Sequence, residues 1–364
     1  MKSNLHSKRK LLVSLLCLTG LLILLAGFLS THSDSYQFRK ATSQLFREEM
    51  LSNTLNMHYT LANPKDFGIK DYEVRLPGYD GSHRQESQQA LEQQIAFYEG
   101  LNPARLSPEE NATRNLLLSY LKNTHCLNQF PYYTEPLSPG SGMQSQLPIL
   151  LAEYTFRDKQ DVEDYLKLLE QIDKYFAGLL TFEQEKAAEG LFMFGSSVDK
   201  VMEQCDTIVT KADLKENTHF LQTTFKERLE GLQKEGLLTT AEAESYVQQN
   251  NRLLSTVLLP AYQSLGDGLT LLKNEKIPLQ GLAASPQGQE YYKALLISET
   301  GSYRTIEEIK ALLKKQLNLE YDTLISLLSQ YAEPALVNAE VTVTECFPYE
   351  NAGEMLQKLT ERMG

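Results

Sequence analysis

Hydrophobic and polar positions along this chain of 364 residues alternate with a helical period over most of its length. Apolar side chains recur three or four residues apart, which places them on one face of an α-helix. In the segment 161–179, for example, the period puts Val162, Tyr165, Leu169 and Phe176 on a shared face. The pattern therefore predicts a mainly α fold built from many helices.

The same period, together with helix-capping residues, predicts most of the remaining helices. They are expected over 35–61, 88–99, 107–121, 183–191, 198–209, 220–234, 240–273, 287–297 and 306–331. Ser107 and Pro108 form a strong start signal, because serine caps a helix and proline fits its first turn. Pro260 lies inside a predicted helix and should kink or divide it. Only residues 341–343 alternate as a strand would.

A loop rich in helix breakers interrupts the pattern between residues 129 and 146. Its prolines and glycines exclude a helix interior. Loops between rigid helices often carry binding groups, so this central loop could line a cleft. The candidate cleft-lining residues are Gly140, Gly142, Gln144 and Gln146, with Tyr303 and Arg304 from a later turn. An ordinary connecting loop is the alternative interpretation.

The N-terminus predicts export or anchoring. Basic residues 8–10 precede an uncharged, strongly apolar run over 11–33, long enough as a helix to cross a bilayer core of roughly 30 Å. The basic flank keeps the short tail in the cytoplasm and places later residues outside. We therefore expect residues 1–33 to be a cytoplasmic tail with a signal or membrane anchor, and residues 34–364 to form a helical extracytoplasmic domain.

The apolar run favours an uncleaved anchor over a cleaved signal. A signal peptide has a shorter apolar region that ends at a small-residue cleavage site. Here the best small residues, Ala26 and Gly27, lie inside the run, and Phe28 stands where a lipoprotein box needs cysteine. The expected location is the cell membrane, with a single pass and an extracytoplasmic domain. Cleavage would instead give a secreted protein.

Composition narrows the partners. The net charge of −12, from 47 acidic and 35 basic residues, argues against nucleic acid, whose phosphates require clustered lysine and arginine. Of the four cysteines, Cys17 lies in the apolar run. Cys126, Cys205 and Cys346 can form at most one disulfide and are expected to be buried thiols.

No motif for catalysis or metal binding emerges from the sequence. A zinc peptidase helix needs two histidines one turn apart with a glutamate beside them. The six histidines are dispersed, at positions 6, 32, 58, 83, 125 and 219. His83 and Glu86 form a lone H-x-x-E pair, for which a solvated loop histidine is the simpler interpretation. We expect no catalytic residue and no metal ligand in this chain.

Several segments, in their order along the chain, resemble the bacterial family called domain of unknown function 885. They include SPGSGMQSQLPILLAEY at 138–154, DVEDYLKLLEQIDKYF at 161–176, LLPAYQSLGDGLTLL at 258–272 and SETGSYRT at 298–305. Members of that family resemble secreted zinc metallopeptidases with a HExxH motif toward the C-terminus. This chain contains no HExxH, so the resemblance implies the N-terminal part of the fold, incomplete relative to the family. Zinc is then expected only if the missing C-terminal region is supplied.

Two functions from different classes remain open. In the first, the chain is a truncated or split member of a metallopeptidase-like family, without catalytic activity on its own, completed by a separate C-terminal half. In the second, it is a non-catalytic extracytoplasmic helical module for binding or scaffolding, with a peptide-sized cleft near the central loop. The expected partners are the membrane, through the N-terminal helix, and either a C-terminal half or a peptide ligand.

Overall fold

The computed structural model describes residues 33–78, 84–273 and 281–331. Helices dominate these residues, and none of the three described ranges contains a strand. The prediction of a mainly α fold is thereby confirmed. The chain divides into two compact units, residues 1–300 and residues 301–364.

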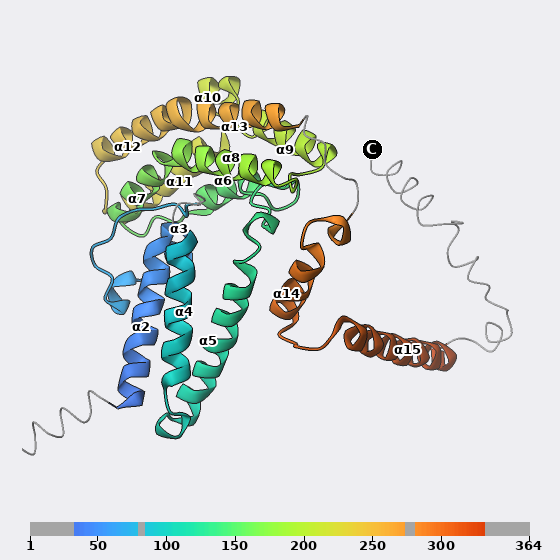
Figure 1. The fold of residues 1–364 in the computed structure, drawn as a ribbon. Coiled ribbons are helices and arrows are strands. Elements are labelled where there is room, and N and C mark those ends of the chain that lie inside the picture. Colours follow the sequence, from blue (N-terminus) through green and yellow to red (C-terminus); the bar gives the residue numbers. More distant parts are fainter. Residues whose placement is uncertain (1–32, 79–83, 274–280, 332–364) are drawn as a thin grey trace, which may run out of the picture. The chain divides into compact units, whose positions relative to one another are not determined.

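The first unit begins with three helices that stand side by side (Figure 1). They are α2 (Asp34–Ser52), α4 (Arg84–Gly100) and α5 (Pro108–Leu127). A small core holds them together, made of Phe38, Tyr98, Leu101 and Leu121. The short helix α3 (Thr54–Thr60) and the 3-10 helix η1 (Pro64–Phe67) follow α2 and lead toward the second layer.

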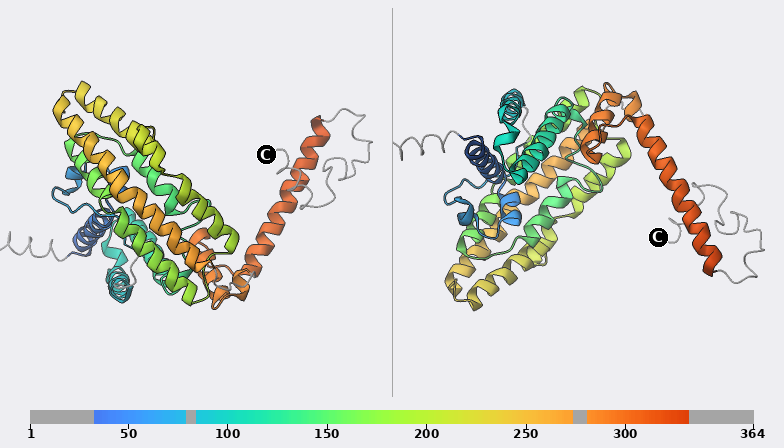
Figure 2. Two further views of the ribbon diagram at one scale, coloured as in Figure 1. Left: turned by 90° about the horizontal axis from the view of Figure 1, so that it is seen from above. Right: turned by 90° about the horizontal axis from the view of Figure 1, so that it is seen from below.

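The second layer of this unit contains the main core. Its helices are α6 (Met143–Glu153), α7 (Lys159–Leu169), α8 (Ile172–Ala188), α9 (Gly195–Thr207), α10 (Lys211–Glu216), α11 (Phe220–Lys234), α12 (Thr240–Leu253) and α13 (Leu259–Leu272). Helix α13 packs on α8 and α9, and α11 packs on α12 and α6. In the views of Figure 2, α2 and α4 are seen nearly end-on, whereas α12 and α13 lie in the plane of the picture. The helices of the two layers therefore cross. The last helix of the unit, α14 (Gly288–Thr300), packs on α5.

The structure places breaks within three predicted helices. The segment 161–179 divides between α7, which ends at Leu169, and α8, which begins at Ile172 and also includes most of the separate helix expected over 183–191. The expected helix over 35–61 divides at Asn53, whose extended backbone and side chain cap α3. The expected helix over 240–273 divides as Pro260 predicted, through a π-helical segment, η5 (Leu254–Leu258). Proline offers no N–H and its ring crowds the preceding turn, which the wider π-turn accommodates. The predicted N-cap at Ser107 is confirmed, since its side chain accepts a hydrogen bond from the Glu110 backbone N–H.

The second unit is described only by a short turn and one long helix, α15 (Ile306–Tyr331), whose bounds match the prediction. Thr305 and Glu308 cap its start, with the Glu308 side chain accepting from the Thr305 backbone N–H at 2.8 Å. Its leucines are largely exposed within the described residues; Leu317 is 65% exposed and Leu313 62%.

Two predictions fall wholly or mainly on residues that the structure does not describe. In the described ranges, no helix combines the length and apolar character that a membrane crossing requires. The apolar run predicted as an anchor lies outside these ranges except for Ser33, and so does the strand expected at 341–343.

The packing of α8 against the main core yields a stability prediction. Leu179 is 0% exposed, and its truncation to alanine should lower the free energy of unfolding by about 2–5 kcal/mol through lost burial and a residual cavity. Leu271, 78% exposed on α13, is the matched control, and Leu271→Ala should change stability by less than about 0.5 kcal/mol. Urea denaturation followed by far-UV circular dichroism measures both. Equal effects of the two substitutions would contradict the described core.

Candidate functional site

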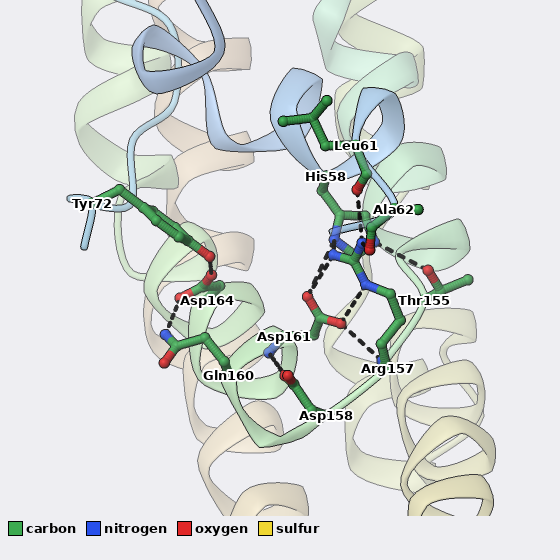
Figure 3. A network of polar contacts seen from close by, with 10 residues as sticks. All are labelled: His58, Leu61, Ala62, Tyr72, Thr155, Arg157, Asp158, Gln160, Asp161 and Asp164. Atoms are coloured by element: carbon green, nitrogen blue, oxygen red, sulfur yellow. Dashed lines mark hydrogen bonds and ion pairs between the residues drawn. The ribbon is translucent and has the colours of Figure 1, made fainter. Parts of the chain in front are cut away.

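A network of polar side chains joins three separate segments of the first unit (Figure 3). Helix α3 supplies His58, the loop between α6 and α7 supplies Arg157, and the first turn of α7 supplies Asp161. Asp158 caps α7, because its side chain accepts a hydrogen bond from the Asp161 backbone N–H. The network therefore fixes the start of α7 against the end of α3.

Arg157 is the centre of this network, and its hydrogen-bonding capacity is fully used. Its Nε and Nη2 donate to the two Asp161 carboxylate oxygens, each at 2.8 Å. Its Nη1 donates to the carbonyl oxygens of Leu61 and Ala62 at 2.8 and 2.7 Å, and Nη2 also donates to His58 Nδ1 at 2.8 Å. A guanidinium has five N–H donors, so none remains for a ligand. Arg157 acts as a structural clamp.

The clamp also settles the proton position on His58. The Arg157 guanidinium can only donate, so the Nδ1 atom of His58 must accept. A neutral ring then carries its proton on Nε2, which lies 3.1 Å from the Thr155 hydroxyl oxygen. The ring stacks on Tyr154, with centroids 3.6 Å apart. Both ring nitrogens are therefore occupied by protein groups.

Two aspartates one turn apart on α7 respond to this environment in opposite directions. Burial alone would raise the pKa of Asp161, but the hydrogen bonds and charge of Arg157 outweigh burial and hold that pKa well below the ordinary value. Asp164 has no such cation. Burial raises its pKa, although Tyr72 and Gln160 donate hydrogen bonds to its two oxygens. The network thus holds one firmly ionised carboxylate and one that ionises less readily.

A pocket of about 510 Å³ opens beside the network. Its lining includes Arg157, Gln160 and Asp161, together with residues 62–65 and 69–72. Lys65, Lys70 and Asp71 are exposed there, and none of their side chains contacts a charged partner among the described residues. The pocket therefore combines a fixed polar floor with a rim whose charges are available.

The structure separates the cleft-lining residues predicted from the central loop. Gln144 is 0% exposed. Its side-chain Nε2 donates to the Ser138 carbonyl oxygen and to the Gln204 side chain. Its backbone carbonyl oxygen accepts a hydrogen bond from the Tyr262 hydroxyl. Gly142 is also buried. A side chain there would stand 2.2 Å from the Ser138 backbone nitrogen, so this turn requires glycine.

The other predicted residues are more exposed than Gln144 and Gly142. Gly140 is exposed, and Gln146 is partly buried in the first turns of α6. Tyr303 and Arg304 are exposed residues of the second unit. A second pocket, of about 250 Å³, does involve the central loop, but through Tyr132, Tyr133 and Glu135 instead.

The sequence carried one signal for the network that pattern reasoning passed over. Arg157 precedes the capping residue Asp158, and Asp161 and Asp164 follow at helical spacing on the buried side of α7. Acidic residues in a first turn usually face water, where they favour the helix dipole. A buried Asp161 that stays ionised requires a cation, and Arg157, four residues earlier in the sequence, supplies it.

The described histidines and cysteines serve separate local roles. His125 contacts Glu92, with 3.2 Å between Nε2 and Oε1, and His219 caps α11. Cys126 is exposed, while burial raises the pKa of the Cys205 thiol to about 12; both are free thiols. Within the described ranges, no group of three or more histidine, cysteine or acidic side chains is placed to hold a metal ion. His6, His32, His83, Cys17 and Cys346 lie outside those ranges.

Comparison with known proteins places this chain in a family. Residues 64–363 match the family described as "Bacterial protein of unknown function (DUF885)". A search of curated proteins gives no match. The fold is similar to the crystal structure of a "putative lipoprotein" from Colwellia psychrerythraea, with a TM-score of 0.64 and 16% identity, covering 82% of this chain and 51% of that one. This chain spans about half the length of that protein, and the similarity at such low identity concerns the fold alone.

The clamp predicts how stability depends on pH. Because the pKa of Asp161 is lowered in the folded state, its contribution is present above pH about 4 and is lost as the pH falls. Asp161→Asn should lower the free energy of unfolding by about 2 kcal/mol at pH 7, a value discounted because the Arg157 side chain is 35% exposed. The deficit should shrink below pH about 4.

Asp71→Asn, at the exposed pocket rim, is the control for this substitution and should change stability by less than about 0.5 kcal/mol. Chemical denaturation at pH 3, 5 and 7 provides the measurement. A deficit that is the same at all three values would show that the Asp161 carboxylate charge is not what stabilises the network.

Proposed function

The chain belongs to the bacterial DUF885 family, and we propose that it is an extracytoplasmic helical module that binds polar, peptide-like segments without catalysing a reaction on its own. The observation that carries this proposal is the pocket of about 510 Å³ beside the Arg157 clamp. Its size falls within the range typical of ligand sites. The polar floor of this pocket is held rigid by the Arg157 network, and the charged side chains at its rim have no ion-pair partner among the described residues. Such a pocket suits a ligand that carries several hydrogen-bonding groups.

The chemistry of the pocket supports recognition in preference to reaction. A general base needs a nitrogen or oxygen that is free to take a proton from a substrate. In the network, His58 is held on both nitrogens and Asp161 is paired with Arg157. The rim offers two ammonium groups, from Lys65 and Lys70, and the carboxylate of Asp71. Such mixed charge suits a peptide that bears both signs.

A location outside the cytoplasm fits two observations of different kinds. The basic residues 8–10 followed by the apolar run 11–33 have the composition of an export or anchoring segment. The Colwellia protein of similar fold is named a "putative lipoprotein", and a comparable location for this chain agrees with that name. We therefore propose a membrane-attached extracytoplasmic domain, over residues 34–364, with secretion as the alternative if the segment is cleaved.

A second function fits the comparison of lengths. The structural alignment covers 82% of this chain but 51% of the Colwellia protein, so a relative with this fold carries a further part of similar size. The family resemblance suggests that such a part holds a HExxH zinc site. In this version the chain is the helical framework of a metallopeptidase-like assembly, and it is active only when a separate C-terminal half is bound.

Peptide binding is tested by reversing the rim charges. The full-length chain, immobilised in detergent, is exposed to a mixture of random hexapeptides, and the retained fraction is measured by mass spectrometry. The double substitution Lys65→Glu/Lys70→Glu should lower retention at least about tenfold, equivalent to about 1.4 kcal/mol. Lys211→Glu/Lys215→Glu, on the exposed side of α10, makes the same change in net charge elsewhere and should leave retention unchanged. Equal losses, or no retention by the native chain, would refute the proposed pocket.

Zinc and hydrolysis distinguish the two functions. The chain alone should contain less than one zinc per molecule after dialysis and should not cleave peptides, with or without added zinc, because a catalytic zinc needs three protein ligands. Elemental analysis and a fluorogenic peptide assay measure both. If a HExxH-bearing C-terminal half of a DUF885 relative restores chelator-sensitive cleavage only when mixed with this chain, the assembly version stands. Cleavage by the chain alone would contradict both versions.

A further inference from the structure

A buried pair of opposite charges lies at the end of α8, away from the Arg157 network. Glu183 is 0% exposed and Lys186 is 1% exposed, with 3.6 Å between Lys186 Nζ and Glu183 Oε2. Lys186 lines the pocket of about 250 Å³ at the central loop. A lysine buried at the floor of a pocket is uncommon, because its charge loses hydration there.

Glu183 is a poor counter-ion for this lysine. Both of its carboxylate oxygens are buried and lack a hydrogen bond of ordinary length in the described structure, because the Lys186 Nζ contact to Oε2 is 3.6 Å long. An ionised carboxylate in such a place is strongly disfavoured. Burial raises the pKa of Glu183 to about 7, even though the nearby Lys186 charge acts to lower it. Burial thus disfavours the ionised form of Glu183, the form that would pair best with Lys186.

Lys186 keeps capacity for another partner. Its Nζ donates to the Thr134 carbonyl oxygen at 2.9 Å, which uses one of its three donors. Two other acids border this region. Glu185 accepts from the Tyr132 hydroxyl at 3.2 Å, and Glu135 is exposed at the rim, without an ion pair to Lys186 within 4.0 Å. The ammonium at the floor is thus without a closely bound, fully ionised partner in the described residues.

The pocket walls combine aromatic and aliphatic side chains with polar groups. Tyr132, Leu191, Phe192 and Phe194 line them, and Leu282 closes one side. The Tyr133 ring is stacked on Tyr291, with centroids 4.3 Å apart, which holds that side of the pocket in place. A site of this size and lining takes a small ligand with a flat or compact apolar body.

We propose that this pocket binds a small monocarboxylate with an aromatic or branched apolar body, its carboxylate on the Lys186 ammonium and its body against Tyr132 and Phe192. Binding would supply Lys186 with the ionised partner that Glu183 provides poorly. The alternative ligand is a cation, with its ammonium group at Glu135 and its body over the aromatic rings. Such a cation would have to approach the Lys186 ammonium. Like-charge repulsion in a site of low polarity disfavours this arrangement.

Ligand-observed NMR tests the proposal with three probes that share a ring and differ in charge. Benzoate, benzyl alcohol and benzylamine are titrated separately against the full-length chain in detergent. Benzoate should bind at least about tenfold more tightly than either of the others. Lys186→Met should weaken benzoate binding at least about tenfold. Lys174→Met, the same change on the exposed side of α8, is the control and should leave binding unchanged.

A second variant keeps the test decisive if Lys186→Met fails to fold. The double substitution Glu183→Gln/Lys186→Met leaves no buried charge and should fold while losing benzoate binding equally. Three results would overturn the proposal: no benzoate binding by the native chain, binding that survives removal of Lys186 in a folded variant, or tighter binding of benzylamine that is lost in Glu135→Gln. None of these results bears on the hexapeptide measurement, because that pocket shares no lining residue with this one.

Discussion

The saturation of Arg157 is the constraint on which the candidate site depends. One side chain joins the end of α3, the loop before α7 and the first turn of α7, and all five of its donors have protein acceptors. These contacts fix the proton on His58 and keep Asp161 ionised. A guanidinium suits this place because its planar fork reaches a carboxylate, two carbonyl groups and an imidazole at once, which a lysine ammonium could not do.

The two pockets of the first unit differ in how their charges are satisfied. Beside Arg157, the buried charges are matched within the protein, and only the exposed rim residues Lys65, Lys70 and Asp71 have capacity for a ligand. At the end of α8, Lys186 is buried beside an acid whose oxygens lack a hydrogen bond of ordinary length. Glu183 also opposes the pH trend of Asp161: because its folded pKa is raised to about 7, its contribution to stability falls as the pH rises from about 4.5 toward 7.

Both pockets depend on the crossing of the two helical layers. Helix α3 and the residues after it meet the start of α7 through the hydrogen bonds of Arg157, and the central loop connects α5 to α6. The pockets form beside these connections, because connecting segments cannot pack as closely as helix faces do. The similarity of fold to the Colwellia protein at 16% identity shows that this arrangement of helices tolerates extensive sequence change.

The sequence by itself determined the helical fold, the bounds of helices such as α11 and α15, and the division near Pro260, because these follow from local period, capping and the geometry of proline. It could not determine which polar residues meet. Gln144 was expected at a cleft and lies in the core, where the Ser138 carbonyl oxygen and the Gln204 side chain accept hydrogen bonds from its Nε2. His58 and Arg157 are 99 residues apart and share no local pattern. Burial turned Asp161, Glu183 and Lys186 from ordinary helix charges into the groups that define the two pockets, and burial is decided only when distant helices pack.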